Sequence, residues 1–215
     1  VAHLEANAGG IHALLVQTAK PRIFIAGADI KYIAATKHFS HDQVVQFCER
    51  GQHLYQRFAE LPFPTVGLIQ GACVGGGLEF ALALDWRIAA QHRNTLIGLP
   101  EVLLGLIPGW GGTVRAPRLV GLSNALELIT SGDSIDSDTA MVTGWCDDVV
   151  TVDQLLPASS ASSRSSAKSE MRKNHCVSSR RSTGAPERQP QPFSTCSLAS
   201  TVMSTGSQFT TAFLR

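Results

Sequence analysis

The chain has 215 residues, a net charge of +1 and a mean hydropathy of +0.07, which fits one soluble domain with a sizeable core. No run of about 18 apolar residues is present, which excludes a hydrophobic membrane span. The first residues, VAHLEANAGG, lack the basic and apolar regions of a signal peptide. Because the sequence does not begin with Met, we expect it to be a fragment of a longer chain.

Charge divides the sequence into two parts. Residues 1–158 carry 10 Lys and Arg against 15 Asp and Glu, whereas residues 159–215 carry 8 against 2. Fifteen of those last 57 residues are Ser, a composition that buries too little apolar surface to offset the entropy lost on ordering. We therefore predict a body over residues 1–156 and a basic tail over 157–215 that is disordered or frameshifted. Contact of this tail with nucleic acid or anionic lipid is the less favoured interpretation.

The five cysteines are odd in number, scattered and without a CxxC pair. This pattern favours free thiols in a reducing compartment over a disulfide framework or a zinc site.

The body alternates predicted strands and helices. Residues 11–18 and the start of 22–30 are strand candidates. Residues 42–61 place most of their apolar side chains on one helical face, and Pro62 and Pro64 end that helix. Residues 65–74 form a buried strand candidate that leads through three glycines into a helix over 75–85.

The second half of the body continues this alternation. Residues 86–91 and 95–100 are strand candidates, and 122–132 predict a helix with Ser123 as N-cap and Gly132 as C-cap. Residues 135–150 predict a helix followed by a short strand. Strands alternating with helices indicate an α/β layered fold.

Two small-residue turns are candidate anion sites. AGADI (26–30) follows a strand, and GACVGGGLE (71–79) places three glycines at the start of a helix. Free N–H groups and the helix dipole favour negative charge there. The spacing matches neither a P-loop nor GxGxxG, so a nucleotide site is disfavoured. An oxyanion site for a thioester carbonyl, built from preorganised N–H donors, is the better interpretation.

Two carboxylates accompany these turns. Glu79 lies in the first turn of the helix that follows the glycines, and Glu101 follows a strand within an apolar stretch. Burial raises the pKa of a carboxyl group and so suits it to proton transfer near neutral pH. A further glycine-rich segment, GLIPGWGGT (105–113), predicts close backbone packing around a ligand or a reacting water.

Together, FIAGADIK (24–31), PTVGLIQGACVGGGLEFALALDWRIA (64–89) and IGLPEVLLGLIPGWGGTVRAPRLVG (97–121) resemble the crotonase superfamily of enoyl-CoA hydratases and isomerases. The resemblance covers residues 1–156 and is strongest to the hydratase domain of the multifunctional fatty-acid oxidation enzymes. It implies a crotonase fold of repeated ββα units and hydration of trans-2-enoyl-CoA to 3-hydroxyacyl-CoA in β-oxidation. It implies no metal or redox cofactor, since coenzyme A belongs to the substrate.

The resemblance also implies roles for individual residues. Glu79 corresponds to the family's water-activating base and Glu101 to its acid, and the N–H groups of Ala28 and Gly76 correspond to the oxyanion hole. Further substrate contacts fall on Ala26, Asp29, Ile30, Lys31, Gly75, Pro108 and Gly109. The family implies a homo-oligomer or multienzyme complex in the intact parent, with no nucleic acid and no membrane span. It also implies the cytoplasm, or the mitochondrial matrix in a eukaryote.

Three other functions stay open. A 3,2-enoyl-CoA isomerase usually keeps the carboxylate at the Glu101 position and replaces the other, so the presence of both favours hydration. The chain is alternatively a piece of a bifunctional hydratase and 3-hydroxyacyl-CoA dehydrogenase, although it contains no dinucleotide-binding fingerprint. An inactive truncated pseudoenzyme is the alternative outside the enzyme class, since the family has about 40 further residues before this start.

Overall fold

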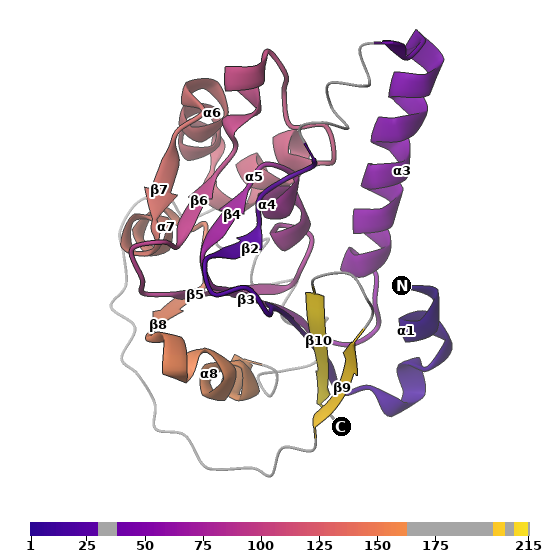
Figure 1. Ribbon diagram of the computed structural model, residues 1–215, viewed down its shortest axis with the longest axis vertical. Helices are drawn as coiled ribbons and strands as arrows, with labels where there is room; N and C mark the ends of the chain where they lie inside the picture. Colours follow the sequence, from indigo (N-terminus) through magenta and orange to yellow (C-terminus); the bar gives the residue numbers. More distant parts are fainter. Residues whose placement is uncertain (30–37, 163–199, 205–208, 215) are drawn as a thin grey trace.

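The computed structural model describes residues 1–29, 38–162, 200–204 and 209–214 (Figure 1). Helices and strands follow one another in this order: α1 (Ala2–Ala6), η1 (Ala8–Gly10), β1 (Ala13–Thr18), β2 (Ile23–Ile25), α3 (His41–Ala59), β3 (Thr65–Ile69), β4 (Ala72–Val74), α4 (Gly76–Ala81), β5 (Trp86–Ala90), β6 (Leu96–Gly98), η3 (Pro100–Leu104), α5 (Gly112–Val120), α6 (Leu122–Ser131), β7 (Ser134–Asp136), α7 (Ser137–Thr143), β8 (Asp148–Val150), η4 (Val152–Gln154), α8 (Leu155–Ser162), β9 (Ser200–Ser204) and β10 (Phe209–Leu214).

The first six strands alternate in pairs between two sheets. The larger sheet has the order β8-β5-β3-β1-β10-β9, and the smaller has the order β2-β4-β6-β7. The neighbours β1, β3, β5 and β8 are parallel, as are β2, β4 and β6. Each pair of strands, one in each sheet, is followed by a helix, which confirms the predicted α/β architecture of repeated ββα units.

Both faces of the larger sheet are covered, as in most parallel sheets. Leu14 and Val16 of β1 face the main core, whereas Leu15 between them faces a smaller cluster under α8. This alternation follows from the two-residue repeat of a strand. It explains why β1 and β3 are continuous apolar runs rather than alternating patterns.

Helix α3 confirms the predicted helix over 42–61. Its capping box joins Ser40 and Gln43, with Gln43 N donating to Ser40 Oγ and Ser40 N donating to Gln43 Oε1. The apolar face of this helix is largely open, because Val45 and Leu54 are 39% and 44% exposed. Only the carboxyl half of α3 packs on the core, and Figure 1 shows the helix along one side of the molecule.

The later elements match the expected order with two differences. Helix α6 begins at Leu122 with Gly121 as its N-cap, so the prediction of Ser123 as N-cap is wrong, whereas Gly132 ends the helix as predicted. Strand β7 was not expected, and it pairs antiparallel with β6 at the edge of the smaller sheet. Its sequence, SID, is too short to carry a strand period.

The segment predicted as a tail contributes three described pieces. Residues 157–162 complete α8, which begins before the predicted boundary. Strands β9 and β10 form a hairpin, and β10 pairs antiparallel with β1 from Ala13↔Leu214 to Thr18↔Phe209 (Figure 1). The rest of that segment lies outside the described residues, and its assignment as a separate tail stays a prediction.

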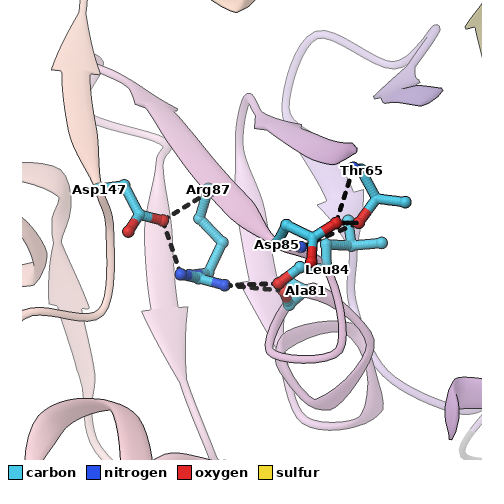
Figure 2. Close-up of polar contacts among 6 residues, drawn as sticks. All are labelled: Thr65, Ala81, Leu84, Asp85, Arg87 and Asp147. Atoms are coloured by element: carbon cyan, nitrogen blue, oxygen red, sulfur yellow. Dashed lines mark hydrogen bonds and ion pairs between the residues drawn. The ribbon is translucent and has the colours of Figure 1, made fainter. Parts of the chain in front are cut away.

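Polar contacts join the carboxyl end of α4 to neighbouring strands (Figure 2). Arg87 is 1% exposed, and its Nη1 donates to the carbonyls of Leu84 at 2.9 Å and Ala81 at 3.4 Å. Its Nη2 lies 2.6 Å from Asp147 Oδ2, which ties β5 to the residue before β8. Beside them Asp85 Oδ2 accepts from both the N–H and the hydroxyl of Thr65.

Candidate active site

Glu79 lies in the first turn of α4 and is 2% exposed. Its Oε1 accepts from Trp110 N at 2.7 Å and from Gly112 N at 2.8 Å. Gly112 is the first residue of α5, so the carboxylate lies at the amino end of that helix, where its dipole favours negative charge. Burial raises the pKa of Glu79, while these N–H groups and the charge of Arg115 oppose the rise.

Glu101 lies in the first turn of η3, and the environment of its carboxyl group differs from that of Glu79. Its Oε2 is buried and accepts no hydrogen bond among the described residues. Burial raises the pKa of Glu101 to about 7, and the nearby charge of Glu79 adds to the rise. Near neutral pH the group is therefore divided between its acid and its carboxylate, as proton donation requires.

Two N–H groups are available beside these carboxylates. The turn at Gly27 packs against the turn at Gly75, since a Cβ added to Gly27 would lie 3.8 Å from Gly76 N. Within the described ranges, neither Ala28 N nor Gly76 N donates a hydrogen bond. A Cβ on Gly75 would lie 3.3 Å from Glu101 Oε1, which places this turn next to the Glu101 carboxyl group. Such paired donors match the requirement of an oxyanion site.

One cavity of about 280 Å³ joins these groups. Its polar and backbone lining includes Ala26, Ala28, Gly75, Gly76, Glu79, Glu101 and Gly109. The remaining wall is mainly apolar and comes from α3 and from the segment after η3, with Val44, Phe47, Leu104, Leu106, Ile107 and Trp110. A cavity of this kind suits a ligand with an apolar body and few polar groups.

Helix α3 fixes the wall opposite Glu79. Gly51 faces the Trp110 ring so closely that any Cβ there would collide with it. The Tyr55 hydroxyl donates to Gly76 O at 2.9 Å, and its ring meets the Trp110 ring edge-on with centroids 5.6 Å apart. The α3 face thus contacts both the turn at Gly75 and Gly76 and the Trp110 segment.

Comparison with known proteins identifies this arrangement. The family model described as enoyl-CoA hydratase/isomerase matches residues 7–186. The chain belongs to the enoyl-CoA hydratase/isomerase family. It is 48% identical over 144 residues to the fatty acid oxidation complex subunit alpha of Aliivibrio fischeri, covering 67% of this chain and 21% of the relative. It is 44% identical over 155 residues to that of Vibrio cholerae, covering 72% and 22%.

A solved structure agrees with this assignment. Enoyl-CoA hydratase from Bacillus anthracis superposes with a TM-score of 0.65 at 29% identity, covering 83% of this chain and 69% of that one. The chain spans only about a fifth of the length of the curated relatives it matches, at 21% and 22%. The family match and the superposition confirm the crotonase fold expected from the sequence.

Most residues predicted for the hydratase site meet at the cavity. The exceptions among the described residues are Asp29, which is exposed, and Pro108, which is buried; neither lines the cavity. Ile30 and Lys31 lie outside the described residues. The functions of all these residues remain predictions.

Sequence analysis missed the contacts of Gln52, Tyr55 and Arg115. Gln52 and Tyr55 lie on α3, far along the chain from the residues that they contact, and no local motif marks them. The only signal was their helical spacing, which places both on the face next to Gly51.

In the described part of the chain, no group of three or more His, Cys, Asp or Glu side chains is arranged to hold a metal ion. None of its helices combines the length and apolar character needed to cross a membrane.

Proposed function

We propose that this domain is an enoyl-CoA hydratase that adds water to trans-2-enoyl-CoA to give 3-hydroxyacyl-CoA in fatty-acid β-oxidation. The observation that carries the proposal is the pair of unlike carboxylates at one cavity. Glu79 is held by two N–H groups, whereas Glu101 has an oxygen without a partner and a pKa of about 7. Addition of water to a conjugated thioester needs one base and one acid.

The thioester oxygen binds between Ala28 N and Gly76 N. As water attacks, negative charge moves from the double bond to this oxygen, and the two donors stabilise the enolate. Both turns are held in place before substrate arrives, so the stabilisation requires little reorganisation. The apolar wall around Phe47 and Ile107 takes the acyl chain and excludes bulk water.

The two carboxylates divide the proton transfers. Glu79, in its carboxylate form, accepts a proton from the water whose oxygen bonds to C3. Glu101 is protonated and delivers its proton to C2 as the enolate collapses. The product gains one oxygen and two hydrogens, and exchange with solvent restores the starting protonation of both groups. The chain supplies the base, the acid and the oxyanion donors, so the proposed reaction uses no metal or redox cofactor.

The cellular setting is part of the proposal. The curated relatives are bacterial and are named as subunits of a fatty acid oxidation complex. We therefore place the parent protein in the bacterial cytoplasm, or in the mitochondrial matrix if the source is eukaryotic. There it acts on acyl-CoA thioesters as a homo-oligomer or within a multienzyme complex.

Hydration of crotonyl-CoA tests the proposal, followed by the loss of absorbance of the conjugated thioester. We expect turnover by the wild-type chain and a loss of about 10²- to 10⁴-fold in Glu101→Gln, the usual contribution of a catalytic acid. Glu127→Gln is the matched control, because it makes the same change on the exposed face of α6. A folded wild-type chain without turnover would instead support the pseudoenzyme alternative.

A further inference from the structure

Three consecutive peptide groups form the turn that holds Glu79. The first joins Gly109 to Trp110 and the third joins Gly111 to Gly112, and the N–H of each donates to Glu79 Oε1. A peptide group is planar, so the direction of its carbonyl fixes the direction of its N–H. Whatever holds the three carbonyl oxygens of this turn therefore also aims the two N–H groups at the carboxylate.

The Arg115 side chain holds the middle one of these carbonyls. Its Nη1 donates to Trp110 O at 3.2 Å, and the same peptide group carries the Gly111 N–H, which also lowers the pKa of Glu79. The Gly111 carbonyl accepts from the backbone N–H of Arg115 at 2.8 Å, a helical bond that does not depend on the side chain at 115. Gly111 leaves room for the guanidinium, since its φ is 112° and a Cβ there would collide with Nη1. A side chain at this position would therefore displace Arg115 and strain the backbone.

Helix α3 holds the rest of the turn. Gln52 Nε2 donates to Gly109 O at 2.7 Å, which is the carbonyl of the peptide group that carries the Trp110 N–H. One helical turn later, Gln56 Oε1 accepts from Arg115 Nη2 at 3.1 Å. All three carbonyls thus have donors, and the Arg115 side chain joins the middle one to Gln56 of α3.

We propose that the Arg115 side chain is a positioning group for Glu79, which it serves by holding the Trp110 carbonyl and joining this turn to α3, with Gln52 in support. The proposal rests on the proposed function, in which Glu79 activates water. Arg115 acts through the turn rather than on the substrate. Hydrogen bonds in such a chain polarise one another, so a donor on Gly109 O also strengthens the bond from Trp110 N to Glu79.

Charge adds to the geometry. The ionisable groups that act on Glu79 are Arg115 from α5, Glu101 from η3 and Tyr55 from α3. Arg115 is the cation of this set and lowers the pKa of Glu79, against the effect of burial. Its removal should therefore raise the pKa of Glu79 and reduce the fraction of base at a given pH.

Steady-state hydration of crotonyl-CoA by Arg115→Met tests the proposal. We expect kcat to fall about 10- to 100-fold, the effect of a small misplacement of a catalytic group, with KM changed by less than about twofold. The acidic limb of the kcat profile should move to higher pH. Arg115→Lys should recover part of kcat, because it keeps the charge and one donor. Gln52→Leu, which leaves Arg115 in place, should lower kcat by a smaller factor.

Arg118→Met is the matched control, since it removes the same charge from an exposed position one turn further along α5. Equal kinetic effects of the Met variants at 115 and 118 would overturn the proposal. A rise in KM with unchanged kcat would also overturn it.

If the wild-type chain has no hydratase activity, the proposed function is wrong, but the positioning role of Arg115 can still be tested. Amide hydrogen exchange then gives the answer in the folded protein. The Trp110 and Gly112 amides should exchange faster in Arg115→Met than in Arg118→Met. Equal exchange rates at these two amides would overturn the positioning role.

Discussion

The two ends of helix α4 have opposite environments. At the amino end, Gly76 lines the cavity and its N–H donates no hydrogen bond to the described residues, and Glu79 one turn later accepts hydrogen bonds from another segment. At the carboxyl end, the Ala81 and Leu84 carbonyls accept from the buried guanidinium of Arg87 (Figure 2). A helix always leaves polar groups unpaired at its ends. In α4 the carbonyl groups at the carboxyl end have donors, whereas Gly76 N at the amino end is available to a ligand. The carboxyl end therefore contributes to stability, and the amino end belongs to the proposed active site.

The largest expected effect is on the chemistry. Glu79→Gln should lower hydration of crotonyl-CoA about 10²- to 10⁴-fold, because an amide cannot take a proton from water. The melting temperature should change little, since the amide oxygen still accepts from Trp110 N and Gly112 N. Isomerisation of a 3-enoyl-CoA, followed by the appearance of the conjugated thioester, should be largely kept.

Glu127→Gln serves as the control for that variant as well. If hydration and isomerisation fall by the same factor in Glu79→Gln, Glu79 is not the specific base for water.

The next largest effect is on stability, through the contacts at the carboxyl end of α4. Arg87→Met removes the ion pair with Asp147 and the guanidinium donor to the Leu84 and Ala81 carbonyls, of which Ala81 O still accepts from Leu84 N, so the free energy of unfolding should fall by about 3 to 5 kcal/mol. Urea unfolding measures this loss. Activity per folded molecule should stay near that of the wild type, because no cavity residue is changed.

Two further variants test whether the loss of stability comes from the buried ion pair. Arg93→Met removes an exposed arginine and should leave stability unchanged. Replacement of both partners, Arg87→Met with Asp147→Leu, should recover much of the stability, because no buried charge is then left alone. A kcat loss in Arg87→Met as large as that of Glu79→Gln would contradict the division of roles between the two ends.

The smallest effect is a change of titration. Glu101 should titrate at about pH 7 in carboxyl ¹³C NMR of the free protein, since burial raises its pKa. Glu79→Gln should lower the pKa of Glu101, because it removes a negative charge that favours the protonated form. The protonated fraction of Glu101 falls as pH rises through its pKa, so kcat/KM of the wild type should decline on the alkaline side. A Glu101 pKa near 4.5 in the wild type would contradict the buried environment.

Sequence reasoning reached those parts of the site that depend on local patterns. The glycines at 75–77 need a close approach of backbone, and Glu79 follows them at a fixed helical distance, so both were predictable. The position of Glu101 after β6 was also predictable, because the strand and the following Pro100 mark it. These residues meet because parallel strands end at the same edge of a sheet.

The rest depends on contacts between distant segments. Arg115 reaches a carbonyl on the turn before its own helix and a glutamine 59 positions earlier, and backbone carbonyls carry no sequence signal. The exposure of Val45 and Leu54 could not be predicted for a related reason. A helical face gives the same apolar pattern whether it covers a core or borders an open cavity, and only the tertiary arrangement separates the two.

The aromatic wall of the cavity has a spectroscopic consequence. Trp110 lines the cavity and packs against Phe47 and Tyr55, whereas Trp145 is 1% exposed and lies in the main core. In the proposed function, an acyl chain that enters the cavity should shift the Trp110 emission to shorter wavelength, while Trp145 and Trp86, which packs against the smaller cluster away from the cavity lining, should keep a constant signal. The protein therefore carries an intrinsic fluorescent probe of ligand occupancy together with its own internal reference.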